Sequence, residues 1–344
     1  MNTTAIINPL KNKQYLDFIE NHLTVNTFHT LSWITLLSEA YGYKPLACVY
    51  GNSKGTIEAA VPFLEFWRFP IGNCWVSLPF TDYCPPLYTN SEELQAILKY
   101  LINIREERRI KCMEIRFAIP FENGIFQDSS FVLHALRLSP DLDALFKSFG
   151  KKFRQYPRKA EREGLYLKTY VSIKDIDTFY DLHLKTRKKL GVPIQPKRFF
   201  KLLWKRLIDK GLGKVFLAFY KDKPVSASVV LTYRKHAMIK YSASDPSYLH
   251  LRPHYFIFWK SIEWAAKNGF QQIDFGKTEV NNLGLRKFKD GWGAVEEPLA
   301  YSFIASSLPS SGNGLLHRIG GTVIRHSPSF VCRGIGEAFY KYFG

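Results

Sequence analysis

The feature that most constrains the fold is the order of the elements expected in the second half of the chain. Helices are expected over 179–190 and 196–211, before strands over 215–220, 225–233 and 237–243. A helix over 255–267, stopped by Asn268 and Gly269, and a strand over 271–275 complete the series. Helices, an antiparallel meander, a helix and a strand in this order predict an α/β unit.

The first half of the chain shows a similar order. Helices are expected within 12–42, and strands over 46–50 and 56–64, from Trp75, and over 113–117. Ser91 is the expected N-cap of a helix that runs to about Arg109, and Ser139 with Pro140 is expected to open the next helix. Two similar domains are therefore expected, at 1–138 and 139–305, although the halves share no visible sequence identity.

A C-terminal tail over 306–344 follows the two expected domains. Small residues over 306–314 predict a linker. Two short amphipathic helices should come next, one with Leu315, Leu316 and Ile319 on its apolar face and one with Val331 and Ile335. We expect the tail either to pack on the first domain or to contact an anionic membrane surface.

Composition limits the class of protein. The chain has 344 residues, 46% of them hydrophobic and 23% charged, which excludes a disordered chain and suits about two globular domains. No stretch approaches the ~20 apolar residues of a membrane span, and no signal peptide is visible. The five cysteines are scattered and form no C-x-x-C pair, so neither disulfides nor a metal site is expected. We expect a cytoplasmic protein, or one that lies peripherally at the inner face of the membrane.

The net charge of +18 predicts phosphate-rich partners, such as nucleic acid, nucleotide-linked substrates or anionic lipid. One concentration of charge lies over 151–163, with six basic and two acidic residues. Lys151, Arg154, Arg158 and Arg162 fall on one helical stripe if the helix continues through Pro157. Arginine is well suited to bidentate phosphate contact, whereas the alternative is an ordinary solvated face.

A second basic segment spans Lys185–Lys214 and holds eleven Lys or Arg against one acid, Asp209. No acidic residues at helical spacing neutralise it, and such charge repels itself unless a polyanion lies near. We therefore expect this segment, including Arg187 and Arg198, to bind a phosphate-bearing ligand.

Candidate chemistry lies after the strand over 271–275. Acyl transfer needs a base for the attacking amine or hydroxyl and a positive donor for the oxyanion that forms. Asp274 can serve as the base and Lys289 as the donor. The alternatives are that Asp274 caps a turn and that Lys289 is an ordinary surface lysine.

Three motifs in order resemble the FemAB-like branch of the GNAT superfamily. They are D-F-G-x-T-x-x-x-N-x-G-L-x-x-F-K-x-x-W-G from Asp274 to Gly293, S-x-P-F-x-D-Y from Ser77 to Tyr83, and R-x-x-x-R-K-A-x-x-x-G from Arg154 to Gly164. The basic ending after Arg325 is also similar to that of many members. This branch includes acetyltransferase-like proteins of cellulose and exopolysaccharide synthesis and transferases that build peptidoglycan bridges.

The resemblance implies two tandem GNAT-like α/β domains with the acceptor bound between them. It also implies that the lysine of the F-K pair, here Lys289 after Phe288, lies beside the transferred acyl group, with Asp274 in the place of an aspartate used by related transferases. The residues expected to bind substrate are Arg154, Arg158, Arg187, Arg198, Arg252, His254, Lys277, Asn281, Phe288, Asp82 and Tyr83.

One departure concerns the donor. A GNAT enzyme that uses acetyl-CoA carries a glycine-rich loop that cradles the pyrophosphate at a helix N-terminus. The corresponding segment here, 245–254, contains no glycine, and only Arg252 and His254 lie near the helix start. The donor is therefore either an acyl-CoA, such as acetyl-CoA, bound in a less familiar way, or an aminoacyl-tRNA as in FemAB proteins.

The expected function is transfer of an acyl or aminoacyl group to an amine or hydroxyl of a cell-envelope glycan or peptidoglycan-type precursor, without a metal. The first alternative is a non-catalytic protein of the envelope-polysaccharide machinery that keeps the fold as a binding platform. The second is a nucleic-acid binder, which ranks last because no nucleic-acid module is recognisable.

Overall fold

A computed structural model describes residues 2–120, 124–168, 172–309 and 315–342, and the chain divides into two compact units. The first unit comprises residues 1–131, 298–311 and 341–344, and the second comprises 132–297 and 312–340. The boundary falls inside two strands, β6 (Ile125–Arg137) and β13 (Val295–Ala305). The units are therefore interleaved along the chain, whereas the domain boundaries expected from the sequence assumed contiguous segments.

The sheet of the first unit has the order β1-β2-β3-β4-β5-β13. Its strands are β1 (Thr3–Ile7), β2 (Lys44–Gly51), β3 (Ile57–Arg68), β4 (Gly72–Val76) and β5 (Cys112–Ile115), with the end of β13. Only β4 and β5 pair in parallel, because helix α3 (Ser91–Glu107) crosses over between them. Helices α1 (Lys13–Asn21) and α2 (Leu31–Tyr41) connect β1 to β2.

The sheet of the second unit has the order β6-β11-β10-β9-β8-β7. Its strands after β6 are β7 (Tyr166–Leu167), β8 (Gly213–Tyr220), β9 (Lys223–Tyr233), β10 (His236–Ser244) and β11 (Gln272–Asp274), and the two-residue β12 (Thr278–Glu279) pairs with β6. The predicted meander is confirmed, since β8, β9 and β10 pair antiparallel in sequence order.

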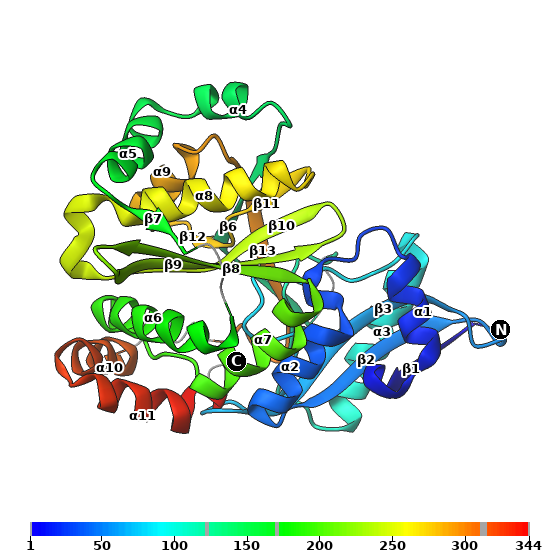
Figure 1. Ribbon diagram of the computed structural model, residues 1–344. Coiled ribbons are helices and arrows are strands. Elements are labelled where there is room, and N and C mark those ends of the chain that lie inside the picture. The colour runs from blue at the N-terminus through cyan, green and yellow to red at the C-terminus, as the bar shows by residue number, and fades with distance from the viewer. Residues whose placement is uncertain (1, 121–123, 169–171, 310–314, 343–344) are drawn as a thin grey trace. The chain divides into compact units, whose positions relative to one another are not determined.

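Helices cover both faces of this second sheet (Figure 1). On one side lie α4 (Leu142–Ser148), α5 (Lys151–Arg162), α8 (Pro253–Lys267) and α9 (Leu283–Asp290). On the other lie α6 (Ile176–Leu190) and α7 (Lys197–Arg206). Short 3-10 turns complete the described chain: η1 (Pro9–Lys11), η2 (Thr27–His29), η3 (Ile173–Asp175), η4 (Ile208–Lys210), η5 (Pro246–Leu251) and η6 (Tyr340–Tyr342).

Two expectations about helix starts are corrected, and one helix was not expected. The N-cap of α3 is Asn90 rather than Ser91, because Asn90 and Glu93 form a reciprocal capping box. Asp141, not Ser139, caps α4. Residues 283–290, for which the sequence predicted no element, form helix α9, whose N-cap Asn282 accepts from the Leu285 amide.

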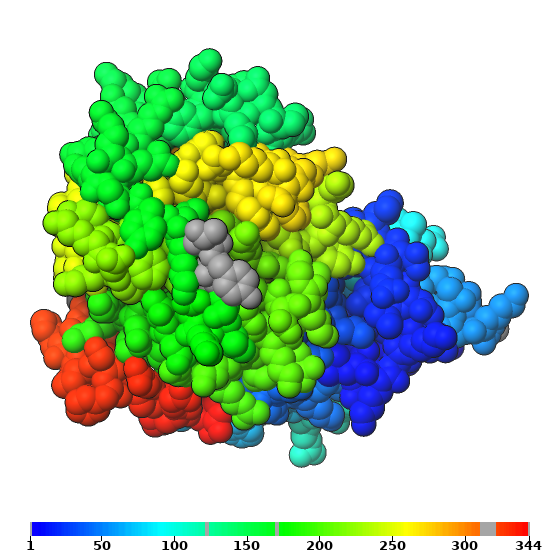
Figure 2. Space-filling view, in the orientation of Figure 1, coloured from blue at the N-terminus to red at the C-terminus, as the bar shows by residue number. Residues whose placement is uncertain are grey.

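The two helices of the tail pack on the second unit, which differs from the expected packing on the first domain. Helices α10 (Leu315–His326) and α11 (Ser329–Phe339) both contact α6, and Figure 2 shows them against it. Arg325 Nη2 donates to Leu190 O, and Glu337 accepts from the Lys197 amide. Linker residues 310–314 and the side chains of the predicted apolar face of Leu315, Leu316 and Ile319 lie outside the described residues. Beyond α11, Tyr43 donates to Lys341 O within the first unit.

Buried ion pairs fix the loop that carries the S-x-P-F-x-D-Y motif in the first unit. Glu114 lies between Arg68 and Arg116, each with a nitrogen 2.8 Å from a carboxylate oxygen. Arg116 also donates to Thr81 O, and its amide donates to Ser77 Oγ. Burial alone would raise the pKa of Glu114, but the two guanidinium groups outweigh it and lower that pKa from 4.5 to about 2.

We predict that Gly336→Ala destabilises the protein while Gly334→Ala, on the same helix, does not. A Cβ at Gly336 would lie 2.1 Å from Ile194 O, whereas one at Gly334 meets nothing within 4 Å. The first change should lower the free energy of unfolding by ~1–3 kcal/mol, and the second should leave it unchanged or raise it by up to ~1 kcal/mol. Chemical denaturation measures both, and equal effects would show that α11 does not pack as described.

We predict that Glu114→Gln lowers the free energy of unfolding by ~3–5 kcal/mol, because two buried arginines lose their counter-charge. Since the folded pKa is lowered, the stabilisation by Glu114 is complete above pH 4.5 and is lost as pH falls toward about 2. The variant should lack this pH dependence. Glu65→Gln serves as control, since its partner Lys44 is exposed and the pair contributes at most ~1 kcal/mol. Denaturation at pH 7 and pH 3 distinguishes the two.

Candidate active site

The site lies where two parallel strands of the second unit part. Strands β10 and β11 pair over three residues only, ending at Met238 opposite Asp274. Strand β11 stops there, while β10 continues to Ser244 after a register shift between Ile239 and Tyr241. Ligands of α/β proteins bind at such openings beyond the carboxyl ends of parallel strands. The predicted residues Asp274 and Lys277 therefore lie at the opening.

The turn after β11 is held by its own buried charges. Asp274 is buried, and its Oδ1 accepts from the Gly276 amide at 2.6 Å. Gly276 has a φ of +73°, a left-handed conformation that favours glycine. Asp274 therefore caps the turn, as the alternative interpretation of the sequence held. Its role as a base stays a prediction.

Lys289 is a buried lysine, not a surface one. Its side chain points inward from α9 and is 3% exposed. Its Nζ donates to Gly276 O at 2.6 Å and to Lys277 O at 3.3 Å. Because an ammonium group is rarely buried without partners, these carbonyl oxygens fix its position beside the turn. Lys287, two residues earlier on the same helix, is exposed, because residues two apart on a helix point in different directions.

Phe288 connects this turn to the start of α8. Its ring centroid lies 5.9 Å from that of His254, 5.3 Å from that of Tyr255 and 5.1 Å from that of Phe258. The aromatic cluster continues to the fully buried Trp292. The F-K pair therefore places its phenyl ring against α8 and its ammonium group against the loop after β11. Asn281, in contrast, is exposed before the helix start.

The N-terminus of α8 is surrounded by positive charge. Arg252, its N-cap, has a φ of +58° and stacks 5.2 Å over the ring of Tyr156. No acidic residue occupies the first turn. Burial first, and then the charges of Arg252 and Lys189, lower the pKa of His254 from 6.5 to about 4. A neutral imidazole, two cations and a helix N-terminus form a site suited to an anion.

The other basic residues predicted to bind substrate do not form one patch with Arg252 and Lys189. Helix α5 continues through Pro157, as the stripe requires, but Arg158 stacks over Phe146 at 4.7 Å. Arg154 is half-buried on α5, and its Nε has no hydrogen-bond partner among the described residues. Arg187 donates to Pro193 O, and Arg198 is exposed on α7, on the other side of the sheet.

The expectation that the segment Lys185–Lys214 is not neutralised is partly wrong. Lys185 pairs with Asp245 at 2.5 Å, and Lys197 pairs with Asp177 at 3.0 Å. Both acids lie outside the segment, so spacing within it could not reveal them.

The sequence interpretation missed three charged or titratable residues around Lys289. His134, on β6, is 1% exposed, and its backbone oxygen accepts from the Phe275 amide at 2.8 Å. Its Nε2 lies 3.1 Å from Glu296 Oε2. Arg286, one turn before Lys289, binds both oxygens of Glu296 at 2.7 and 2.8 Å. No motif signalled His134 or Glu296, because strand pairing alone brings them to the loop.

Asp82 and Tyr83 belong to the first unit. Their loop contains two residues other than glycine with positive φ, Leu78 at +58° and Phe80 at +64°. Tyr301 donates to Asp82 O at 2.5 Å, and the ring of Tyr83 contacts that of Phe28. Backbone strain held by buried contacts is common in binding loops.

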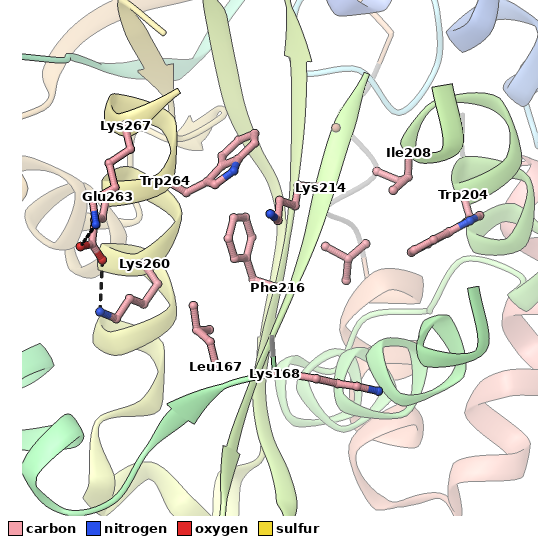
Figure 3. A pocket seen from close by; sticks show the side chains of 12 residues that line it. Leu167, Lys168, Trp204, Ile208, Lys214, Phe216, Lys260, Glu263, Trp264 and Lys267 are labelled. Carbon is pink, nitrogen blue, oxygen red and sulfur yellow. Dashed lines mark hydrogen bonds and ion pairs between the residues drawn. The ribbon is translucent and has the colours of Figure 1, made fainter. Parts of the chain in front are cut away.

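A separate cavity of about 530 Å³ lies beside β8 in the second unit (Figure 3). Its walls include Trp204, Phe216 and Trp264, and Lys260 and Lys267 both pair with Glu263. None of the predicted site residues lines it. Among the described residues no cluster of His, Cys, Asp or Glu could hold a metal ion. Within the same ranges, no helix has the length and apolarity needed to cross a membrane.

The comparisons with known proteins agree with this fold. Residues 147–290 match a family model described as an acetyltransferase (GNAT) domain. No curated protein matches the chain. The crystal structure of FemX is similar over 87% of this chain and 96% of its own, with a TM-score of 0.66 and 13% identity.

Two further solved structures are similar at this level. A tandem GNAT protein from the clavulanic acid biosynthesis pathway matches 89% of this chain and 100% of its own, with a TM-score of 0.55 and 8% identity. The C-terminal domain of a putative lysylphosphatidylglycerol synthetase from Agrobacterium fabrum matches 84% of this chain and 90% of its own, with a TM-score of 0.51 and 14% identity. The mixed α/β fold is therefore that of two GNAT-like domains in tandem, and a GNAT acetyltransferase domain is matched within residues 147–290.

Proposed function

We propose that the protein transfers an acyl or aminoacyl group to an amine or hydroxyl of a cell-envelope glycan or peptidoglycan-type precursor. The observation that carries this proposal is the buried Lys289 ammonium group at the parting of β10 and β11. Two of the similar structures are FemX and a domain of a putative lysylphosphatidylglycerol synthetase, which favours aminoacyl transfer, whereas the matched GNAT acetyltransferase domain favours acetyl transfer. The finer resemblance to proteins of exopolysaccharide synthesis stays a prediction.

The α8 N-terminus is the proposed site for the donor's phosphate groups. Arg252 and Lys189 supply positive charge there, and His254 is neutral near pH 7 because its pKa is about 4. Side-chain cations thus take the place of the glycine-rich loop. Both acyl-CoA and the phosphate backbone of an aminoacyl-tRNA carry the groups that such a site binds.

The proposed reaction forms one bond and breaks one. The acceptor nitrogen or oxygen attacks the donor carbonyl, and its proton passes to Asp274 or to a phosphate of the acceptor. The tetrahedral intermediate carries a negative oxygen, which Lys289 stabilises with an N–H donor. Collapse of the intermediate breaks the carbon–sulfur bond of an acyl-CoA or the ester bond of an aminoacyl-tRNA, and the leaving group takes up a proton.

Ligands that co-purify with the protein provide the first test. Native mass spectrometry should detect either a CoA species or an aminoacylated RNA, and the species detected identifies the donor. Candidate acceptors can then be assayed with that donor. If no donor binds and no transfer occurs with either class, the chain acts as a non-catalytic binding protein instead.

Contact with an anionic membrane stays part of the proposal for the acceptor. On the tail, Phe330 is 73% exposed and Val323 is 47% exposed, with Arg325 and Lys341 also exposed. Flotation with vesicles that contain or lack anionic lipid tests this contact.

We predict that Lys289→Ala and Lys289→Met both lower kcat by roughly a hundred- to a thousandfold, because one oxyanion donor is lost. The Met variant keeps the volume of the buried side chain, so its stability separates catalysis from folding. Lys287→Ala, on the exposed face of the same helix, is the matched control and should keep normal turnover. Steady-state transfer assays measure all three, and near-normal kcat in the Met variant would remove Lys289 from the mechanism.

We predict that Arg252→Ala weakens binding of coenzyme A by roughly ten- to a hundredfold at low salt, since a hydrogen bond to a charged group contributes about 1.5–3 kcal/mol. The difference from the unaltered protein should shrink at high salt, where counterions screen the site. Lys201→Ala removes a similar charge from the exposed face of α7 and should leave affinity unchanged. Calorimetry at two salt concentrations measures the effect. Equal affinities of Arg252→Ala and Lys201→Ala for coenzyme A would show that the donor does not bind at the N-terminus of α8.

A further inference from the structure

Side chains of helix α9 donate hydrogen bonds to the backbone of the loop between β11 and α9. Lys289 binds the carbonyl oxygens of Gly276 and Lys277. Arg286 donates from Nη1 to Val280 O at 2.9 Å, farther along the same loop. Arg286 and Lys289 lie three residues apart on α9 and therefore project from one face of the helix. The position of the Lys289 ammonium group thus depends on where α9 lies.

Glu296 holds the exposed end of this arrangement. Both carboxylate oxygens of Glu296 accept hydrogen bonds from Arg286, and this bidentate geometry fixes the orientation of the guanidinium group as well as its distance. The Arg286 and Glu296 side chains are 30% and 33% exposed, so solvent screens their ion pair in part. A buried contact of the same carboxylate would add to the restraint on Glu296.

His134 is the buried group that contacts Glu296. Its Nε2 lies 3.1 Å from Glu296 Oε2, and the residue is 1% exposed. Neither ring nitrogen makes a well-aligned hydrogen bond among the described residues. The only carboxylate at hydrogen-bonding distance from the ring, within those residues, belongs to Glu296. Burial and then the charge of Lys289 lower the pKa of His134, and Arg286 acts in the same direction while Glu296 opposes it.

The main chain of His134 reinforces the same contact. Its carbonyl oxygen accepts from the Phe275 amide, at the point where β11 gives way to the loop. One residue therefore fixes the start of the loop through its backbone and, through its side chain, the carboxylate that binds α9. The imidazole itself is buried, and dense packing leaves a buried ring little freedom to move.

We infer that His134 is a positioning residue for Lys289, and that it acts through Glu296 and Arg286 by fixing α9 and the loop 275–282. The inference deepens the proposed function and rests on it for the role of Lys289. His134 does not touch the reacting atoms in this scheme. Its Nε2 contacts the Glu296 carboxylate at 3.1 Å, Glu296 orients Arg286, and Arg286 positions the helix that carries Lys289.

Two substitutions at His134 distinguish the effect of its polar ring nitrogen from the effect of its side-chain volume. His134→Leu keeps an apolar volume but removes the donor, whereas His134→Gln places an amide N–H near the position of Nε2. We expect His134→Leu to raise amide hydrogen exchange in peptides covering 275–290 by about tenfold or more, beyond any change in global stability. His134→Gln should restore exchange to within about threefold of the unaltered protein.

The same variants have a kinetic signature once the donor is known. His134→Leu should lower kcat by roughly ten- to a hundredfold, because a small displacement of Lys289 suffices, while the KM for the donor changes little. His134→Gln should recover most of kcat. If His134 had only a structural role, both variants would lower the stability of the protein, and Gln would not selectively restore kcat.

Matched controls use another buried histidine and a neighbouring acid. His183 is 4% exposed in the same unit, with its Nε2 3.4 Å from Gln195 Oε1, and His183→Leu should not change exchange in 275–290 beyond its global effect. If His134→Leu does not fold, Glu296→Ala tests the same chain of contacts from its solvent side, with Glu297→Ala as control. Normal exchange in 275–290 for Glu296→Ala or His134→Leu, or no rescue by Gln, overturns the inference. Absence of transfer in the unaltered protein would overturn the proposed function alone, because the exchange result stands without activity.

Discussion

The architecture of the second unit's site depends on the burial of the Lys289 ammonium group. Taking such a charge out of water costs several kcal/mol unless hydrogen bonds satisfy it. Two backbone oxygens of the loop 275–282 accept hydrogen bonds from it, so the loop must keep those carbonyl groups turned inward. The left-handed Gly276 and the cap from Asp274 make that turn possible. Sheet, turn and helix therefore constrain one another through one side chain.

The cations at the start of α8 follow from a second constraint. A glycine-rich loop binds phosphate with backbone N–H groups, but Pro253 at the first position of α8 has no N–H to offer. The segment before it forms the 3-10 helix η5, which ends in the left-handed Arg252. Positive charge at this helix N-terminus must therefore come from side chains, and Arg252 and Lys189 supply it from two different elements.

The sequence predicted the repeated α/β pattern, the meander and the helix after it, because these segments have clear periodicity and turn residues. It did not predict β6 or β13. The first half of β6 carries the polar residues Gln127 to Ser130, and in β13 two acidic residues and Pro298 precede the apolar residues, so each strand extends beyond its apolar run. Tertiary pairing overrides such local signals. Asp274 and Lys289 could be named as candidates from their motif, whereas His134 and Glu296 become neighbours only because β6 and β13 lie side by side in the sheet.

Phe288 gives the two halves of the candidate site a physical connection. Its ring contacts His254 and Tyr255 at the start of α8, and the next residue, Lys289, points to the loop after β11. Since aromatic clusters pack densely and resist small shifts, a displacement of α8 at its N-terminus is transmitted to α9. An anion held by Arg252 would therefore restrain the same helix that positions Lys289. In the proposed mechanism, donor binding at Arg252 and orientation of the Lys289 ammonium group would therefore be coupled through the ring of Phe288.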